Sequence, residues 1–140
     1  MLSVVSRSKT KIQTQKTMKI LTLIARSLLG LIFVVFGLNA FLQFIHMPPP
    51  QGMAGDFMKA LFASHYFYVV AVLQIAGGAI CLLGRFVPLG LTLLGPVIVN
   101  ILLFHVFLEP SGLPLAVVVG ALALFLLWAY RPAFSGLIKP

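Results

Sequence analysis

Four long apolar stretches, separated by short groups of polar and charged residues, dominate the pattern of this chain. No Asp, Glu, Lys or Arg occurs in the stretches 27–55, 60–84, 86–108 and 110–130. Each stretch is long enough to supply the roughly 20 apolar residues that an α-helix needs to cross a hydrocarbon core about 30 Å thick. None of them alternates apolar and polar residues as a membrane β-strand does. The pattern therefore predicts an all-α integral membrane protein with four spans, at about residues 20–44, 66–83, 89–108 and 115–130.

Proline, glycine and polar residues mark the breaks between the predicted spans. The first span ends at residues 47–50 (MPPP), since proline has no N–H to donate and disfavours a helix before it. Asp56 then follows as a candidate N-cap, and residues 57–62 predict a short amphipathic helix that lies in the membrane interface between spans one and two. Residues 84–88 predict a tight turn, and residues 109–114 a loop that leads to the fourth span.

Composition agrees with a chain that lies mostly in lipid. Of its 140 residues, 61% are hydrophobic and only 9% are charged, whereas a soluble domain carries about 25% charged residues. A domain this small keeps a large surface for its volume, so it cannot hide such a deficit of polar side chains in a core. Much of the protein surface must therefore be apolar and face lipid rather than water.

The few charges are placed asymmetrically, which predicts the orientation of the spans. Arg85, Arg131 and Lys139 flank the spans on the same side as the N-terminal segment, and only Lys59 falls on the other side. Under the positive-inside rule both termini are cytoplasmic, an N-in/C-in topology. The net charge of +8 therefore reflects membrane orientation, and we predict no nucleic-acid partner. Six further bases precede or open the first span: Arg7, Lys9, Lys11, Lys16, Lys19 and Arg26.

Residues 1–19 are rich in Ser, Thr, Lys and Gln and precede the first span. We predict that this segment is a basic disordered cytoplasmic leader or lies on anionic lipid head groups. The run from Ile20 to Phe44 is much longer than the roughly 7–15 apolar residues of a signal peptide, and no small-x-small cleavage site ends it. The transmembrane domain is therefore expected over residues 20–140.

Three side-chain amides lie nearer the middle of the predicted spans, at Asn39, Gln74 and Asn100. Polar groups at membrane depth are costly and normally face the interior of a helix bundle. We expect these three to form interhelical hydrogen bonds, each contributing about 0.6–2 kcal/mol. Gly30 and Gly78 are expected to let backbones approach, as small residues do between membrane helices.

A second group of polar residues falls at the predicted outer ends of spans one and three: Gln43, His46, His105 and Glu109. If these two spans pack against each other, the histidines converge and Glu109 can hydrogen-bond an imidazole. Histidine titrates near neutral pH, so such a cluster suits proton transfer or the binding of a quinone head group. The alternatives are a metal ion, although no spacing of the HExxH kind is present, and simple placement at the polar interface. We name quinone as the candidate cofactor and predict no metal site.

Motifs of established catalytic sites are missing from the sequence. Cys81 is the only cysteine, which excludes an intramolecular disulfide and paired-thiol chemistry. The sequence has no Gly-rich phosphate loop, no Ser-His-Asp set and no CxxC pair. We therefore name no catalytic residue and favour a protein that is not an enzyme.

Four segments, in this order, resemble the DoxX family of small bacterial membrane proteins. They are residues 26–39 (RSLLGLIFVVFGLN), 73–78 (LQIAGG), 83–89 (LGRFVPL) and 96–105 (PVIVNILLFH). The resemblance implies a four-helix membrane bundle in the bacterial cytoplasmic (inner) membrane. It also implies a loose link to quinone-coupled sulfur oxidation and other membrane redox complexes. Many relatives have Lys and Glu where this chain has Ala40 and Gln74, so an ion pair there is replaced by one amide that can still hydrogen-bond.

Three functions follow, in order of preference. The first is a non-catalytic subunit or scaffold of a membrane-associated redox complex, which contacts partner membrane or peripheral proteins or further copies of itself. The alternative is a redox component that binds a quinone at Gln43, His46, His105 and Glu109. The third is a small-molecule transporter, which would have to oligomerise because four helices enclose little cavity.

Overall fold

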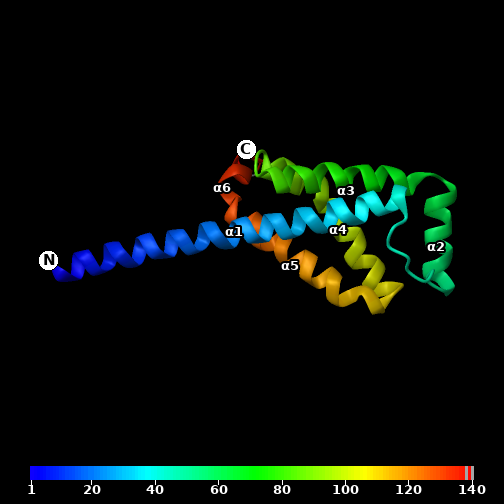
Figure 1. Cartoon of the computed structure of the whole chain (residues 1–140), viewed down its shortest axis with the longest axis horizontal. Helices are drawn as coiled ribbons and strands as arrows, with labels where there is room; N and C mark the ends of the chain where they lie inside the picture. The colour runs from blue at the N-terminus through cyan, green and yellow to red at the C-terminus, as the bar shows by residue number, and fades with distance from the viewer. Residues whose placement is uncertain (138, 140) are drawn as a thin grey trace.

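The computed structural model describes residues 1–137 and 139, and helices account for almost all of them (Figure 1). In chain order the helices are α1 (Leu2–Leu42), α2 (Gly52–Ala63), α3 (Tyr66–Leu83), α4 (Val87–Phe107), α5 (Leu113–Ala129) and α6 (Arg131–Phe134). Two short 3-10 turns, η1 (Pro110–Gly112) and η2 (Ser135–Leu137), follow α4 and α6. No strand occurs in the part of the chain that the structure describes.

Four helical segments are long and apolar enough to cross a membrane: α1, α3, α4 and the segment Pro110–Ala129, which joins η1 to α5. The prediction of an all-α protein with four such helices is therefore confirmed. α3 has the bounds that the sequence predicted, whereas α4 and α5 each begin two residues earlier. The reason is that Pro88 and Pro114 lie in the first turn of these helices, where the missing N–H costs no hydrogen bond.

α1 begins at Leu2, and the prediction of a disordered leader over residues 1–19 is wrong. No proline or glycine occurs before Gly30, so nothing interrupts the helix between the leader and the apolar span. The hydroxyl groups of Thr10, Thr14 and Thr17 donate hydrogen bonds to carbonyl oxygens one turn earlier, at 2.9–3.0 Å. Every residue from Met1 to Thr17 is exposed, and this half of α1 projects beyond the other helices (Figure 1).

A short helix does follow span one, as predicted, but α2 begins at Gly52 rather than after Asp56. Gln51 is its N-cap residue, and its side chain makes no capping hydrogen bond. Gly55 packs against the backbone of Pro50, where an added Cβ would overlap the Pro50 carbonyl oxygen. The first turn of α2 is therefore held by close contact with the proline segment, and no cap at Asp56 is needed.

The long helices pack in the order α1, α3, α4, α5 around the assembly. α1 packs against α3 and α5, and α4 packs against the same two helices. α1 and α4 thus lie at opposite corners, so spans one and three are not packed side by side. α2 lies across one end (Figure 1) and contacts α3. Its Phe57 ring reaches to 5.8 Å from the ring of Phe104 in α4.

Small residues bring the backbones of neighbouring helices together. A Cβ atom added to Gly78 of α3 would lie 2.8 Å from the carbonyl oxygen of Gly30 in α1. Between α3 and α4, a Cβ atom added to Gly90 would lie 3.0 Å from the carbonyl oxygen of Gly77. The expected role of Gly30 and Gly78 is therefore confirmed. The largest fully buried side chains are those of Phe33, Leu29, Leu94, Leu126, Val87 and Cys81.

Candidate functional site

Asn39 closes the end of α1 and does not join two helices. Its side chain accepts a hydrogen bond from the backbone N–H of Ile45 at 2.7 Å and donates one to the Ile45 carbonyl oxygen at 3.3 Å. The chain reverses between these residues through Gln43, which has a left-handed backbone (φ 50°). The interhelical bond predicted for Asn39 is therefore replaced by a local one that fixes the segment after α1.

The other two amides differ in position. Asn100 is exposed, and its Nδ2 donates to the carbonyl oxygen of Pro96 in the same helix at 2.9 Å. The prediction that Asn100 points between the helices is wrong, because Leu94, Val97 and Ile98 occupy the buried face of α4. Gln74 of α3 is half-buried and lies on the face that packs against α1.

The positions of Asn39 and Asn100 predict a large and a small loss of stability, respectively, for the same substitution. Asn39→Leu is expected to lower the free energy of unfolding in detergent by about 2 kcal/mol, because two hydrogen bonds to Ile45 are lost. Asn100→Leu is expected to change it by no more than about 0.5 kcal/mol, as surface substitutions do. Thermal melting of the two variants beside the parent provides the test. Equal destabilisation by both would contradict the placement of Asn100.

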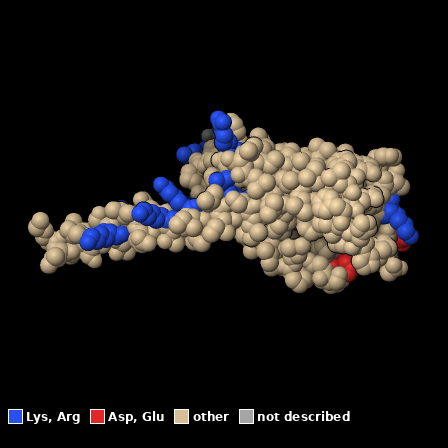
Figure 2. Space-filling view, viewed as in Figure 1, with Lys and Arg blue, Asp and Glu red and all other residues tan. Residues whose placement is uncertain are grey.

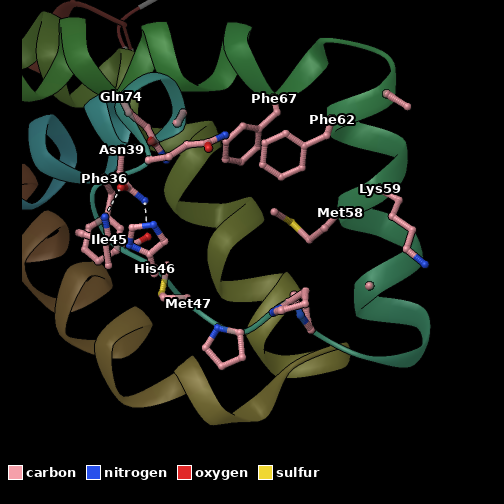
Figure 3. A pocket seen from close by; sticks show the side chains of 17 residues that line it. Phe36, Asn39, Ile45, His46, Met47, Met58, Lys59, Phe62, Phe67 and Gln74 are labelled. Atoms are coloured by element: carbon pink, nitrogen blue, oxygen red, sulfur yellow. Dashed lines mark hydrogen bonds between the residues drawn. The ribbon is translucent and has the colours of Figure 1, made fainter.

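A pocket of about 840 Å³ lies where α1 ends, and α2 and α3 form its other sides (Figure 3). The segment 43–50, which leads from α1 to α2, lines the pocket as well (Figure 3). Four side chains bring hydrogen-bonding groups to the lining, and a fifth, Lys59, lies at the exposed rim, 3.9 Å from the Asp56 carboxylate. The four are Asn39, Gln43, His46 and Gln74.

The rest of the pocket wall is apolar. Phe62 of α2 packs against Phe67 of α3, with ring centroids 4.2 Å apart and the ring planes tilted by 37°, and Met58 points from α2 toward the same space (Figure 3). None of the lining residues is acidic. The pocket can therefore enclose an uncharged, largely apolar molecule that carries hydrogen-bond acceptors for the amide and imidazole N–H groups.

His105 and Glu109 lie outside this pocket, at the connection between α4 and α5. The His105 Nδ1 lies 2.8 Å from the backbone carbonyl oxygen of Glu109, and the imidazole ring packs against Gly112. The Glu109 carboxylate accepts a hydrogen bond from the Ser111 hydroxyl at 2.7 Å. Only the backbone of Glu109, and not its carboxylate, contacts the imidazole.

The predicted outer cluster is therefore divided between two places. Gln43 and His46 line the pocket, whereas His105 and Glu109 belong to the α4–α5 connection. The condition under which the two histidines would converge is not met, because α1 and α4 lie at opposite corners of the assembly. Within the described residues, no group of three or more His, Cys, Asp or Glu side chains is placed to hold a metal ion.

The sequence interpretation missed the apolar wall of the pocket. The side chains of this wall come from α1, α2, α3 and the segment 43–50. The apolar face predicted for residues 57–62 was the one signal in the sequence that pointed to it. The side chains of the wall include Phe36, Met47, Met58, Phe62 and Phe67.

No family model matches the chain, and neither a curated protein nor a solved structure is similar to it at a significant level. The resemblance to the DoxX family therefore stays a prediction.

Proposed function

We propose that this chain is a DoxX-like integral membrane protein that serves as a non-catalytic subunit or scaffold of a membrane-associated redox complex. In this proposal it spans the bacterial cytoplasmic membrane four times as a helix bundle, with both termini in the cytoplasm. The observation that carries the proposal is the exposed half of α1, residues 2–19, which lies beyond the other helices.

The exposed half of α1 has the properties of a docking element. At 1.5 Å per residue, its 18 residues extend about 27 Å. A helix of this length is marginal on its own in water, so contact with a partner would stabilise it. Its charges are all basic, and those near its free end lie further from the bilayer than the Debye length of about 8 Å. An acidic protein surface therefore suits these charges better than lipid head groups do.

The proposal is tested by extraction in a mild detergent, followed by measurement of the proteins that purify with the full chain in fixed ratio. A variant with Arg7, Lys9, Lys11, Lys16 and Lys19 replaced by Gln is expected to lose the partner. Lys59→Gln, a change at the opposite end, should retain it. Identical partner content in all three samples would overturn the role of the exposed half of α1.

The orientation is expected to be N-in/C-in. Reporter fusions after Gln51 and after Ser111 should give a periplasmic signal, and fusions after Arg85 and after Lys139 a cytoplasmic one, because the basic residues stay on the cytoplasmic side. A cytoplasmic signal at Ser111 would contradict a four-span topology.

The pocket favours a second candidate function, a redox component that binds a quinone. The carbonyl oxygens of a quinone are acceptors that match the N–H donors of Gln43, Gln74 and His46, and the apolar wall suits its ring and tail. A quinone analogue should then raise the melting temperature of the parent with increasing dose. His46→Ala should abolish this shift and His105→Ala should keep it, since only His46 lines the pocket. No shift in the parent would remove the support for this candidate.

A further inference from the structure

Arg26 is fixed at the end of the assembly opposite the pocket, where α3 terminates beside α1. Its Nη1 donates hydrogen bonds to the carbonyl oxygens of Cys81 at 3.0 Å and Leu82 at 3.1 Å, in the last turn of α3. The negative end of the α3 dipole favours a cation there. Gly84 has a left-handed backbone (φ 71°), and an added side chain would overlap the Arg26 guanidinium.

Two further cations flank Arg26. Arg85 follows Gly84, the residue that packs against the Arg26 guanidinium group, and Arg85 is exposed. Lys19 lies seven residues before Arg26 and is also exposed, and this spacing places it on the same face of α1. α3 ends before it reaches Lys19, so that part of α1 is uncovered. Lys19, Arg26 and Arg85 together form what we call the basic notch.

No side-chain carboxylate is available to neutralise the basic notch. The sequence contains two acidic residues, Asp56 and Glu109, and both lie at the pocket end of the molecule, far from most of the basic side chains (Figure 2). Asp56 is already next to Lys59. Like charges brought together without a counter-charge repel each other, so the notch suits an anion supplied from outside the chain.

The surroundings of the notch identify the kind of anion. Leu83 and Phe86, on either side of Gly84 and Arg85, expose 76% and 73% of their surface. They mark the level at which the apolar helix α3 ends and the apolar helix α4 begins. For a chain that spans the bilayer, this level is the membrane interface. Arginine forms paired hydrogen bonds with phosphate oxygens, and lysine adds a point charge. Apolar side chains beside them contribute only if the ligand also carries acyl chains.

We propose that the basic notch binds the head group of an anionic phospholipid, with its phosphate between Arg26, Arg85 and Lys19 and its acyl chains along Leu83 and Phe86. The basic notch lies at the end of the assembly opposite the pocket, and it shares only Lys19 with the exposed half of α1. Basic pockets at the cytoplasmic ends of membrane helices are suited to such lipids.

The test is lipid binding to the full chain in mild detergent, followed by native mass spectrometry and by melting temperature. Phosphatidylglycerol should bind saturably and raise the melting temperature, whereas phosphatidylcholine and inorganic phosphate should not. The double variant Lys19→Gln, Arg85→Gln leaves Arg26 in place and should bind phosphatidylglycerol about 30-fold more weakly, from about fivefold for each basic residue.

Arg7→Gln, Lys9→Gln is the matched control, with the same loss of charge on the exposed half of α1, and it should bind phosphatidylglycerol like the parent. Equal binding by the Lys19, Arg85 variant and the parent would overturn the site. Equal weakening in the control would show diffuse attraction without a site, and an equal response to inorganic phosphate would overturn its assignment to a lipid.

Discussion

Gly78→Ala is expected to lower the free energy of unfolding by about 3 kcal/mol, the upper part of the range for overpacked sites. The added Cβ would lie 2.8 Å from the carbonyl oxygen of Gly30 and 3.0 Å from the backbone nitrogen of Val34. Both neighbours are backbone atoms of α1, so no side-chain rotation relieves the contact and α1 and α3 must separate along their interface. Thermal melting in detergent measures the loss.

Gly95→Ala provides the control for this prediction. Gly95 also lies inside a helix, but no atom lies within 4 Å of an added Cβ. Alanine favours a helix over glycine by about 1 kcal/mol, so this variant should melt at the same temperature as the parent or higher. If Gly78→Ala behaved in the same way, the close contact between α1 and α3 would not limit stability.

Arg26→Met should lower the free energy of unfolding by a similar amount, about 3 kcal/mol. Hydrogen bonds to charged groups contribute about 1.5–3 kcal/mol each, and Arg26 makes two, to the carbonyl oxygens of Cys81 and Leu82. Methionine keeps much of the side-chain length, so the change removes mainly the charge and the donors. The measurement is again melting in detergent, with hydrogen exchange of the last turn of α3 as a local readout.

Arg131→Met is the comparison for Arg26. The Arg131 guanidinium donates to the Trp128 carbonyl oxygen at 2.9 Å and lies 4.7 Å from the centre of the Trp128 ring. It is exposed, and it contacts a residue only three positions earlier in the sequence, at the end of α5, rather than a helix that is distant in the sequence. Its loss should therefore lower the free energy of unfolding by about 1 kcal/mol or less. Equal effects of the two substitutions would contradict the role of Arg26 in holding α3 to α1.

The helices could be predicted from the sequence because the membrane sets their length and excludes charge from them. The bounds of α3 were predicted without error for this reason. The helical state of residues 2–19 was not, since a polar composition favours disorder while the absence of proline and glycine permits a helix. In this chain no proline or glycine occurs before Gly30, and residues 2–19 are helical.

The candidate site was predicted only in part. Gln43 and His46 do line a pocket, but His105 does not join them. Hydropathy shows which residues lie at the same end of the helices, and it contains no information on which helices are neighbours. The interhelical hydrogen bond predicted for Asn100 was wrong for a related reason. A polar side chain in an apolar run can donate a hydrogen bond within its own helix, as Asn100 does to the carbonyl oxygen of Pro96.

The uninterrupted course of α1 has a mechanical consequence. Its 41 residues form one rod about 60 Å long, and it has neither proline nor glycine before Gly30 to act as a hinge. Gly30 packs against Gly78 of α3, and Gly37 packs against Ala71 of the same helix, so the second half of the rod is held along its length. A force applied to the free end would therefore be passed along an unbroken helix to the interface between α1 and α3, because no hinge lies between them to absorb it.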